Sequence, residues 1–424
     1  MIKILILGGG FGGIRTALDL SKKFAGRKDV QITLVDKNDS QTFSPALYEI
    51  ASIYGIDHEH PFHSKIRGAV CIPYRDILGS KNMELVQAEI SHIDLEQKHV
   101  VTSAGNTLEF DYLIIALGAV ASTFGIPGAE EYAYKFKTVE DGIMLNDKME
   151  DLYIETGRGE RKAPINILIA GAGFNGIELA AELSNCTVHV AHRHGITHRQ
   201  CATITLIEAG PAILPMVSEA NRRTIEKRLK ELGINVLVNS PVEEVGSDFV
   251  KIKNSGTLSG DLIVWSAGVK SLDLFSRVEG LELDERGRIF VDDFLRVKNR
   301  KNVFAIGDNT IFLDAQNNKP VPQMAFVAIK QGGTAAKNIY ELITAGGDDK
   351  NADLRRYVPG YNFWIAPVGG KNAVAHLGKW GTYSGFLGYV LREAADMRYF
   401  LSILPLWKGL KLFYEDIKVF SRND

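Results

Sequence analysis

Residues 2–13 read IKILILGGGFGG, an apolar and largely β-branched run that enters a glycine-rich turn. Apolar residues then recur at helical spacing in the segment that follows the turn. A second apolar strand, 31–35, ends at Asp36. The order predicts a strand, a tight turn, a helix and a second strand that is closed by an acid.

The same order recurs in the middle of the chain. Residues 165–176 read INILIAGAGFNG, and an apolar strand over 203–207 ends at Glu208. Behind each unit, short segments predict a β-meander that feeds an apolar strand and stops at a glycine. These segments are 83–94, 99–103 and 107–110 before strand 112–117, and 234–239, 242–245 and 249–253 before strand 262–267. The sequence therefore predicts an α/β fold with two Rossmann-like dinucleotide-binding domains, β-meander crossovers and a C-terminal helical region.

The repeat sets the expected domain boundaries. The first domain is expected to be discontinuous, over 1–140 and 270–340, the second to span 141–269, and the C-terminal region to span 341–424. Residues 186–201 are polar and histidine-rich where the second unit should pass from helix to strand, so we interpret them as a surface insertion. The histidines lack spaced cysteine or carboxylate partners, which favours a solvated loop and predicts no metal site. They are His189, His192, His194 and His198.

Each glycine turn has the residues needed to bind a pyrophosphate. The first glycine permits the bend, the second lets the backbone approach the phosphates, and the third lets the helix pack on the strand. Unpaired N–H groups at the helix N-terminus stabilise the anionic oxygens. Asp36 and Glu208 lie where a carboxylate accepts ribose hydroxyls, and Glu208 would repel a 2′-phosphate, which favours NADH over NADPH. The candidate residues are Gly8, Gly10, Phe11, Gly12, Gly13, Asp36 and Lys37 at the first turn, and Gly171, Gly173, Phe174, Asn175, Gly176 and Glu208 at the second.

Charge and cysteine content exclude several classes of protein. With 49 basic and 51 acidic residues, no net positive field attracts nucleic acid, so an anionic ligand must be held by a local site. Cys71, Cys186 and Cys201 form no C-x-x-C pair, which argues against a redox dithiol and favours a reduced, cytoplasmic compartment. The N-terminus lacks the basic region and cleavage site of a signal peptide. No apolar run reaches the roughly 20 residues of a membrane-spanning helix.

A third apolar strand, 303–306, ends in Gly307-Asp308. With this element, most of residues 1–340 resembles the two-dinucleotide flavoprotein superfamily. The resemblance implies FAD on the first turn and NAD(P)H on the second, with Gly307 and Asp308 closing over the flavin. Residues 116–118 read Ala-Leu-Gly where the family usually has Ala-Thr-Gly. Further residues expected beside the nucleotides are Pro45, Ala88, Ala116, Gly118, Ala267, Gly268, Ala325 and Phe326.

Within that superfamily the sequence resembles the type II NADH dehydrogenases, the single-subunit NADH:quinone oxidoreductases. Residues 42–51, 176–183 and 263–269 carry the resemblance and read TFSPALYEIA, GIELAAEL and IVWSAGV. The resemblance implies an FAD-dependent enzyme that takes hydride from NADH and passes electrons to a quinone. It also places Glu178 near the nicotinamide and flavin and Lys371 near the quinone, both as candidate groups of a proton route.

The expected acceptor site departs from the family's pattern. The family's Ala-Gln-x-x-x-Gln should fall on residues 325–330, which read AFVAIK, so both glutamines are missing. Phe326 could stack on a quinone ring and Lys330 could stabilise a reduced quinone oxyanion, but a buried phenylalanine and a solvent-facing lysine explain the same residues. Other acceptors therefore stay open: a ferredoxin or rubredoxin, or none in a slow flavin-binding redox sensor. A sulfide:quinone oxidoreductase is disfavoured because it needs paired cysteines that this chain does not match.

The C-terminal tail predicts two helices, 386–404 and 406–420, separated by Pro405. In the second helix an apolar stripe has Trp407 and Tyr414 beside it, an arrangement typical of a helix that lies in a membrane surface. The type II enzymes carry a C-terminal membrane anchor, which favours peripheral attachment to the cytoplasmic face. The alternative is docking onto the protein's own core or in a homodimer. The stripe is Leu406, Leu410, Phe413, Ile417 and Phe420, with Lys408 and Lys411 flanking it.

Overall fold

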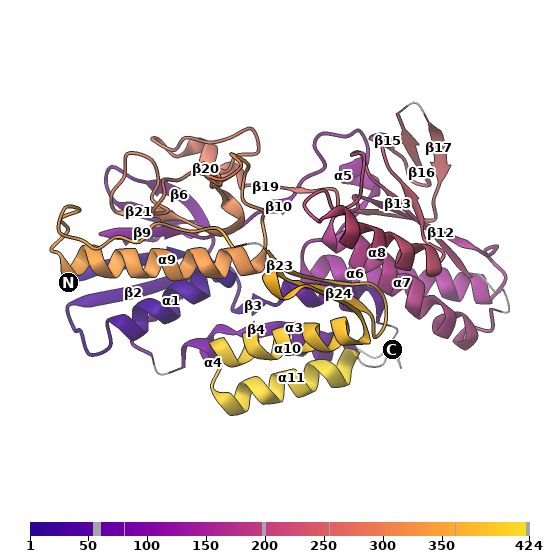
Figure 1. Ribbon diagram of the computed structural model, residues 1–424, viewed down its shortest axis with the longest axis horizontal. Helices are drawn as coiled ribbons and strands as arrows, with labels where there is room; N and C mark the ends of the chain where they lie inside the picture. Colours follow the sequence, from indigo (N-terminus) through magenta and orange to yellow (C-terminus); the bar gives the residue numbers. More distant parts are fainter. Residues whose placement is uncertain (54–60, 80, 197–200, 254, 361, 421–424) are drawn as a thin grey trace.

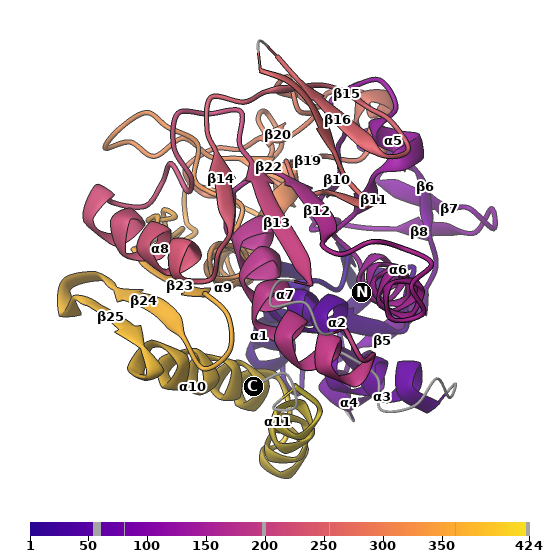
Figure 2. The ribbon, with the colours of Figure 1, turned by 90° about the vertical axis from the view of Figure 1, so that its right-hand side faces the viewer.

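The computed structural model describes residues 1–53, 61–79, 81–196, 201–253, 255–360 and 362–420. Two α/β lobes lie side by side, and the C-terminal part of the chain packs along the lower edge as a small sheet and two helices (Figure 1). Figure 2 looks onto the second lobe, with the two C-terminal helices below it.

The first lobe is built on a five-stranded parallel sheet of order β21-β9-β1-β2-β5. Its strands are β1 (Ile2–Leu7), β2 (Val30–Asp36), β5 (Glu84–Gln87), β9 (Tyr112–Ile115) and β21 (Val303–Ala305). Ile4 and Ile6 of β1 face a core shared with the flanking helices, whereas Leu5 and Leu7 face a second core. A parallel strand that is buried on both faces reads as a nearly continuous apolar run, as β1 does from Ile4 to Leu7. Because β21 pairs with β9, the chain returns to the first lobe after it has built the second.

The second lobe repeats this plan with a parallel sheet of order β11-β18-β12-β13-β14. Its strands are β11 (Tyr134–Lys135), β12 (Ile165–Ala170), β13 (Ala202–Ile207), β14 (Asn235–Leu237) and β18 (Leu262–Trp265). In both lobes the strand before the glycine turn lies in the middle of the sheet. The strand that ends in the acid lies next to it. The α/β fold with two Rossmann-like cores is therefore confirmed.

The crossover segments differ from the expectation at one strand in each lobe. Residues 83–94 form two strands, because β5 joins the parallel sheet and only the second strand belongs to the meander. Residues 234–239 likewise supply β14 of the parallel sheet instead of the first meander strand. The meanders are β6 (Ile90–Asp94), β7 (His99–Thr102) and β8 (Thr107–Glu109), and β15 (Val242–Val245), β16 (Phe249–Ile252) and β17 (Gly256–Ser259). The sequence pattern indicated that β5 and β14 are strands. It did not indicate which neighbouring strand each pairs with, because that depends on the path of the chain between the strands.

Two long helices, α1 (Phe11–Lys23) and α9 (Ala325–Thr344), cover one face of the first sheet. They cross at a point where glycine is required: a Cβ at Gly332 would lie 2.5 Å from the carbonyl oxygen of Gly12. This contact holds the start of α1, and with it the first glycine turn, against α9.

The expected insertion at 186–201 is wrong for its first half, because α7 (Phe174–Arg193) continues as a helix through position 193. His194, just behind it, stacks on Tyr153 with ring centroids 6.2 Å apart and lies 3.3 Å from Glu150. His198 and the side chains of His189 and His192 lie outside the described residues. Among the described residues no cluster of His, Cys, Asp and Glu side chains could hold a metal.

A short helix, α2 (Leu47–Ser52), lies at the junction of the two lobes. It packs against α7 and against α6 (Val139–Gly157), both of which belong to the second lobe. The approach to α6 is close, since a Cβ at Gly142 would lie 3.1 Å from the Ile50 side chain. The segment from 42 to 51, which carries part of the resemblance to type II enzymes, thus touches both lobes.

The C-terminal region adds a three-stranded antiparallel sheet and two helices, which confirms the two predicted helices. They are β23 (Phe363–Pro367), β24 (Ala373–Leu377), β25 (Thr382–Gly385), α10 (Phe386–Ile403) and α11 (Leu406–Phe420). Phe400 of α10 is fully buried and its ring lies 4.8 Å from that of Phe43 in the first lobe. No helix among the described residues is long and apolar enough to cross a membrane.

The remaining elements connect these parts. The helices are α3 (Pro61–Val70), α4 (Tyr74–Leu78), α5 (Ala129–Tyr132) and α8 (Glu219–Glu231). The short strands are β3 (Ser40–Thr42), β4 (Cys71–Pro73), β10 (Val120–Ala121), β19 (Val269–Lys270), β20 (Ile289–Phe290) and β22 (Thr310–Ile311). Because β10 pairs with β19, the two chain segments that pass between the lobes run side by side.

Candidate functional site

The first glycine turn brings the backbones of β1, α1 and the end of β9 into contact. Gly8 has a φ of +97°, and a Cβ there would lie 2.3 Å from the carbonyl oxygen of Ala116. A Cβ at Gly13 would lie 1.8 Å from the carbonyl oxygen of Gly8. Gly10, by contrast, faces open space and begins α1 without a side-chain cap. The amide groups of the first helical turn are therefore presented to an anionic ligand.

Asp36 closes this turn from the end of β2. Its Oδ2 accepts a hydrogen bond from Gly9 N at 2.7 Å and its Oδ1 accepts one from Asn38 N at 2.8 Å. Tyr74 of α4 fills the space beside the turn, since a Cβ at Gly9 would lie 2.2 Å from its hydroxyl oxygen. Burial, together with the Asp36 charge, raises the pKa of Tyr74 well above its usual value, so its hydroxyl remains a donor. The carboxylate is fixed at the strand end, where a ribose is expected.

The second turn has the same construction. Gly171 has a φ of +100°, and a Cβ there would lie 2.6 Å from Ala267 Cα. A Cβ at Gly176 would lie 2.0 Å from the carbonyl oxygen of Gly171, whereas Gly173 faces open space. Gly268, after β18, has a φ of +155° and lies against the Phe124 ring. The two turns are therefore alike in their backbone contacts as well as in their sequence pattern.

Glu208 takes the place of Asp36 at the second turn. Its Oε2 accepts a hydrogen bond from Ala172 N at 2.9 Å, and its Oε1 accepts one from Gly210 N at 2.7 Å. The side chain remains partly exposed at the end of β13. Glu208 therefore accepts hydrogen bonds from the turn backbone as Asp36 does, and it places a negative charge beside the turn.

The third glycine cluster follows β21 and lies against both α9 and the end of β9. Gly307 N donates to Gln331 Oε1 at 2.7 Å, and Gln331 is buried in α9. Asn309 is fully buried, accepts a hydrogen bond from Gly118 N at 2.9 Å and donates one to Ile115 O at 3.1 Å. The structure thus brings Gly118 and Gly307 together at the carboxyl edge of the first sheet. Sequence reasoning missed Asn309, although its place directly after Gly307-Asp308 was a usable signal.

Asp308 has a cationic partner from the chain segment that enters the second lobe. Lys137 Nζ lies 3.4 Å from Asp308 Oδ2, and Gln323 Nε2 donates to the Asp308 carbonyl oxygen at 2.6 Å. Both side chains of the ion pair are partly exposed. The pair places a positive charge beside Asp308 at the edge of the expected site.

Lys37 and Ala88 lie next to each other just beyond β2 and β5. Ala88 N donates to Asp36 O at 2.8 Å, and the Gln87 side chain donates to Lys37 O at 3.3 Å.

Pro45 lies in the short helical turn Ser44–Ala46 that leads into α2 and is half-buried. Phe11 opens α1, and its ring lies 4.9 Å from that of Tyr399. The C-terminal helix α10, which carries Tyr399, therefore reaches the first glycine turn.

Glu178 lies in the first part of α7, on the side that faces α2 and the C-terminal helices. It is partly buried, and burial raises the pKa of its carboxyl to about 8 against the opposing charge of Arg392. Glu49 of α2 is close enough to raise this pKa further. Phe174, at the start of the same helix, contacts Trp364 of β23 with ring centroids 5.8 Å apart. The helix that follows the second glycine turn thus faces the C-terminal hairpin.

The predicted acceptor residues occupy opposite ends of the β23–β24 hairpin. Phe326 lies next to Ala325 at the start of α9, and its ring is 6.1 Å from that of Phe363 at the start of β23. Lys330 Nζ lies 5.9 Å from the Phe326 ring and packs against Gly360. Lys371 is exposed in the turn at the other end, beside Gly370, whose N–H donates to Glu182 at 3.1 Å. The structure brings Phe326 and Lys330 together and leaves Lys371 apart from them.

The prediction that Phe326 is either a stacking platform or a core residue can now be refined. The side chain is 36% exposed, so it is not a core phenylalanine. Phe363, which contacts Phe326, is also exposed, and so is Trp380. The ring centroids of Phe363 and Trp380 are 6.4 Å apart. Three exposed rings in a row, with Lys330 beside the first, form an apolar surface that a planar ligand can enter.

A buried ionic cluster around Arg392 was not foreseen from the sequence. Arg392 is 7% exposed in the middle of α10. Its guanidinium lies 2.7 Å from Glu49 Oε1, 2.7 Å from Glu393 Oε1 and 3.2 Å from Asp396 Oδ2. An arginine and an aspartate four residues apart inside an apolar helix were a usable signal, because charges are rarely buried unless they are paired.

The residues present at the first turn fit an FAD. The glycine contacts leave the backbone of Gly10 open for a pyrophosphate, and Asp36 stands at the ribose position. Gly118, Gly307 and Asp308 line the continuation of the same edge. The second turn fits a nicotinamide dinucleotide for the same reasons, with Glu208 at the ribose position.

Comparison with known proteins agrees with this geometry. The pyridine nucleotide-disulphide oxidoreductase family model matches residues 2–332. The type II NADH:quinone oxidoreductase of Staphylococcus aureus (strain NCTC 8325 / PS 47) is 31% identical over 346 residues, which cover 80% of this chain and 82% of that protein.

Two solved structures show the same fold. NDH2 from Plasmodium falciparum, in complex with NADH, superposes with a TM-score of 0.81 at 20% identity and covers 98% of each chain. The sulfide:quinone oxidoreductase of Aquifex aeolicus superposes with a TM-score of 0.76 at 21% identity over 97% of this chain and 92% of that one. The extent of the family match and the identity to the Staphylococcus enzyme place the chain in the type II NADH:quinone oxidoreductases of the pyridine nucleotide-disulphide oxidoreductase family.

Proposed function

We propose that this chain oxidises NADH with an FAD on the first glycine turn and delivers the electrons to a quinone. The observation that carries the proposal is the pair of equivalent glycine turns, one per lobe, with α2 between the lobes. The FAD domain is then the discontinuous unit 1–140 and 270–340, and the NADH domain is 141–269. Membership of a family that contains a type II NADH:quinone oxidoreductase supports the choice of quinone.

The chain's own residues bind, orient and protect the reactants. Bound FAD supplies the two-electron chemistry that side chains lack. Gly8–Gly13 and Asp36 hold one nucleotide and Gly171–Gly176 and Glu208 hold the other, each at a helix N-terminus. Glu178, with a pKa of about 8, holds a proton at neutral pH at the junction of the lobes. Phe326 and Lys330 form the surface at which the acceptor ring stacks and a reduced oxygen is stabilised.

Steady-state turnover with a panel of acceptors tests the proposal. We expect fast NADH oxidation by the FAD-loaded protein with ubiquinone or menaquinone analogues and with ferricyanide, and slow oxidation with oxygen alone. Turnover with ferricyanide but with neither quinone would reject the quinone and favour a protein acceptor such as a ferredoxin. Slow turnover with every acceptor would favour the redox sensor.

The preference for NADH over NADPH is expected to depend on Glu208. A 2′-phosphate placed at the Glu208 carboxylate is repelled, and the two backbone amides that already donate to this carboxylate cannot neutralise a second anion. Glu208→Gln should lower the ratio of kcat/KM for NADH over NADPH about tenfold, which corresponds to about 1.4 kcal/mol. Glu219→Gln, at an exposed acid of α8, is the matched control. A parent protein that uses both cofactors equally would refute the assignment.

The tail combines the two alternatives that the sequence left open. Leu412 and Phe420 of α11 are buried against the protein, so Phe420 does not belong to an exposed stripe. Leu406, Trp407 and Tyr414 are 59%, 81% and 64% exposed on the opposite side. The packing partner of α11, α10, also carries exposed apolar residues, and we define the two sets together as the docking face: Leu406, Trp407, Leu410, Tyr414, Ile417, Phe386, Leu387 and Val390. Exposed apolar and aromatic side chains on two packed helices support peripheral attachment to a membrane, where quinones dissolve.

Charging the docking face is expected to release the protein from vesicles without unfolding it. The double variant Trp407→Asp/Leu410→Asp replaces two exposed apolar side chains that would insert into the membrane and leaves the buried residues of α11 unchanged. The free energy of membrane binding should weaken by roughly 25 cal/mol per Å² of apolar area lost. We expect loss of sedimentation with anionic phospholipid vesicles and unchanged NADH:ferricyanide turnover. Met144→Asp with Met216→Asp, at exposed methionines elsewhere, should leave binding intact. Salt should weaken binding only slightly, because Lys408 and Lys411 are already paired with Asp76 and Glu415. Equal sedimentation of both double variants would contradict attachment through this face.

A further inference from the structure

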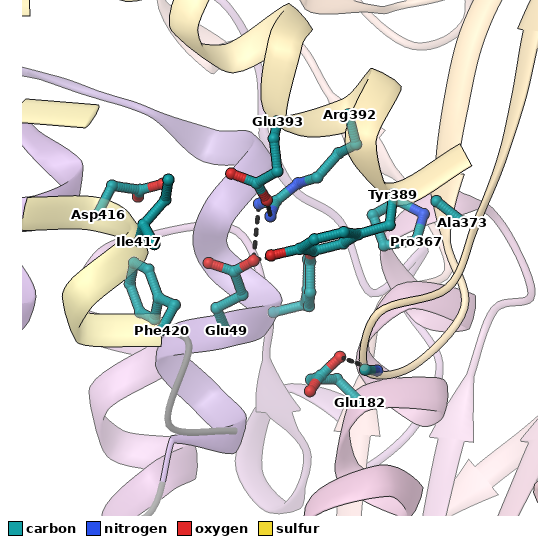
Figure 3. Close-up of a pocket in the computed structure, with 12 residues that line it drawn as sticks. Glu49, Glu182, Pro367, Ala373, Tyr389, Arg392, Glu393, Asp416, Ile417 and Phe420 are labelled. Atoms are coloured by element: carbon teal, nitrogen blue, oxygen red, sulfur yellow. Dashed lines mark hydrogen bonds and ion pairs between the residues drawn. The ribbon is translucent and has the colours of Figure 1, made fainter. Parts of the chain in front are cut away.

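A pocket lies where α11, α10, α2 and α7 meet the turn between β23 and β24 (Figure 3). Its lining includes Asp416 and Ile417 of α11, Arg392 of α10, Glu49 of α2 and Glu182 of α7. Ile417 is 37% exposed, whereas Glu49 and Glu182 are buried. The pocket therefore leads from the surface of α11, beside the docking face, into the junction of the two lobes.

Asp416 is an unusual group on this pocket wall. It is 2% exposed on the buried face of α11, where its neighbours along the helix are Leu412 and Phe420. Its Oδ1 accepts no hydrogen bond from any described residue. An ionised carboxylate is not stable in such a place without a partner. Burial raises the pKa of Asp416 well above its usual value, Glu49 adds to this rise and Arg392 opposes it. Burial therefore favours the protonated form of this side chain, which lines the pocket.

The charged groups near Asp416 are three acids and one arginine among the described residues. The Arg392 guanidinium serves the carboxylates of Glu49, Glu393 and Asp396, and Figure 3 shows Glu49, Glu393 and Arg392 facing one another. Among the described residues, the carboxyl groups of Glu49, Glu393 and Asp396 and the Arg392 guanidinium all act electrostatically on Asp416. Carboxylates this close to one another disfavour each other's ionisation. Burial raises the pKa of Asp396 to about 7. Such a cluster can accept a proton at one carboxyl group and release one at another near neutral pH.

The cluster continues toward Glu178. The Tyr48 hydroxyl donates to Glu49 Oε1 at 2.9 Å, and Tyr389 lines the pocket beside them. Glu182 lies one helical turn after Glu178 on α7, so both are on the same face of that helix. Arg392, Glu49 and Asp396 are the charges that influence the pKa of Glu178, which places the four groups within electrostatic reach of one another.

We infer that Asp416 and the carboxyl groups around Arg392 form a proton relay from the surface of α11 to Glu178 and the acceptor. The inference rests on the proposed function, because only a quinone acceptor needs the proton. In the balanced reaction, NADH and one proton reduce a quinone to a quinol and release NAD+. The hydride carries two electrons and one hydrogen nucleus, so the second hydrogen of the quinol comes from solvent. Ferricyanide takes electrons alone, and its reduction by NADH releases a proton.

Asp416→Asn tests the relay, because asparagine keeps the shape and neutrality of the protonated acid but cannot release a proton. At pH 8 we expect kcat for a short-chain quinone to fall at least about tenfold, with KM for the quinone unchanged. NADH:ferricyanide turnover of the same protein should change less than about twofold. Asp416→Glu, which restores a titratable carboxyl, should recover quinone turnover. Glu415→Gln, at the adjacent half-exposed acid paired with Lys411, is the matched control.

The outcomes separate the relay from a structural role and from the proposed function. Equal quinone turnover of Asp416→Asn and the parent from pH 6 to pH 9 overturns the relay. An equal loss with quinone and ferricyanide, accompanied by loss of FAD, identifies a structural role and also overturns it. A parent protein that reduces no quinone refutes the proposed function instead. The infrared difference spectrum between the oxidised and reduced protein then decides on the relay: a protonated-carboxyl band that Asp416→Asn removes supports it, and its absence overturns it.

Discussion

The Gly13→Ala protein is expected to purify without FAD, whereas the Gly176→Ala protein is expected to retain FAD and lose the use of NADH. Each new methyl group would lie about 2 Å from a carbonyl oxygen of its own turn, at 1.8 Å from Gly8 O and 2.0 Å from Gly171 O. Backbone cannot move aside without opening the turn that presents the helix N-terminus to a phosphate. We expect kcat/KM for NADH to fall at least about a hundredfold in Gly176→Ala.

Absorbance of the bound flavin, thermal unfolding and reoxidation by quinone after dithionite reduction distinguish the two variants. The yellow Gly176→Ala protein should still reoxidise with quinone, because its first site is intact. Gly68→Ala is the matched control, since Gly68 lies in α3 with no atom within 4 Å of a Cβ. Loss of FAD from Gly176→Ala, with FAD retained by Gly13→Ala, would reverse the proposed assignment of the two sites.

Much of the fold was predictable because both lobes depend on local patterns. The strand over 2–7 is apolar at every position except Lys3, and the glycines behind it are required by contacts within the same turn. Strand pairing at the sheet edges was not predictable in the same way. Residues 84–87 show the same short strand pattern as a meander strand, and only the crossover decides that they pair with β2. The helix through position 193 was missed because its polar, histidine-rich composition is typical of a loop.

The candidate site divides in a similar manner. The sequence predicted Gly8, Asp36, Gly171 and Glu208 because each contacts the backbone of its own strand–turn–helix unit. The separation of Lys371 from Lys330 depends on the length of the β23–β24 hairpin, whose two ends face different helices. Glu178 was placed only by resemblance. Its surroundings combine α2, α7 and α10, segments that lie far apart in the chain.

The Arg392 cluster joins segments that no local pattern connects. It fixes α10 to α2, and α10 in turn carries part of the docking face and Tyr399, which packs on Phe11 at the first glycine turn. Removing residues 385–424 would therefore expose the core around Phe400, which is fully buried. The tail is therefore part of the folded protein as well as the proposed surface for attachment.

Replacing Arg392 by methionine is expected to destabilise the protein strongly at pH 8, by about 3–5 kcal/mol. The change leaves the buried Glu49 and Asp396 and the partly buried Glu393 near Asp416 without the arginine that they share. Arg392→Lys keeps the charge but replaces the five donors of a planar guanidinium with the three of a compact ammonium group, so an intermediate loss is expected. Arg223→Met is the control, because the Arg223 side chain is 74% exposed and its pair with Glu219 contributes at most about 1 kcal/mol.

The pH dependence of this loss identifies its cause. In the folded parent, the pKa of Asp396 is raised to about 7 from the ordinary value of 3.8, and that of Asp416 is raised as well. The folded state therefore binds more protons than the unfolded state between these values, and its stability falls as the pH rises from about 4 through 7. Without Arg392 the same carboxyl groups bind protons still more tightly, so the slope becomes steeper. Urea-unfolding midpoints of parent and Arg392→Met should lie close together at pH 5 and far apart at pH 8. A difference that is independent of pH, or larger at pH 5, would mean that lost packing and not uncompensated charge causes the destabilisation.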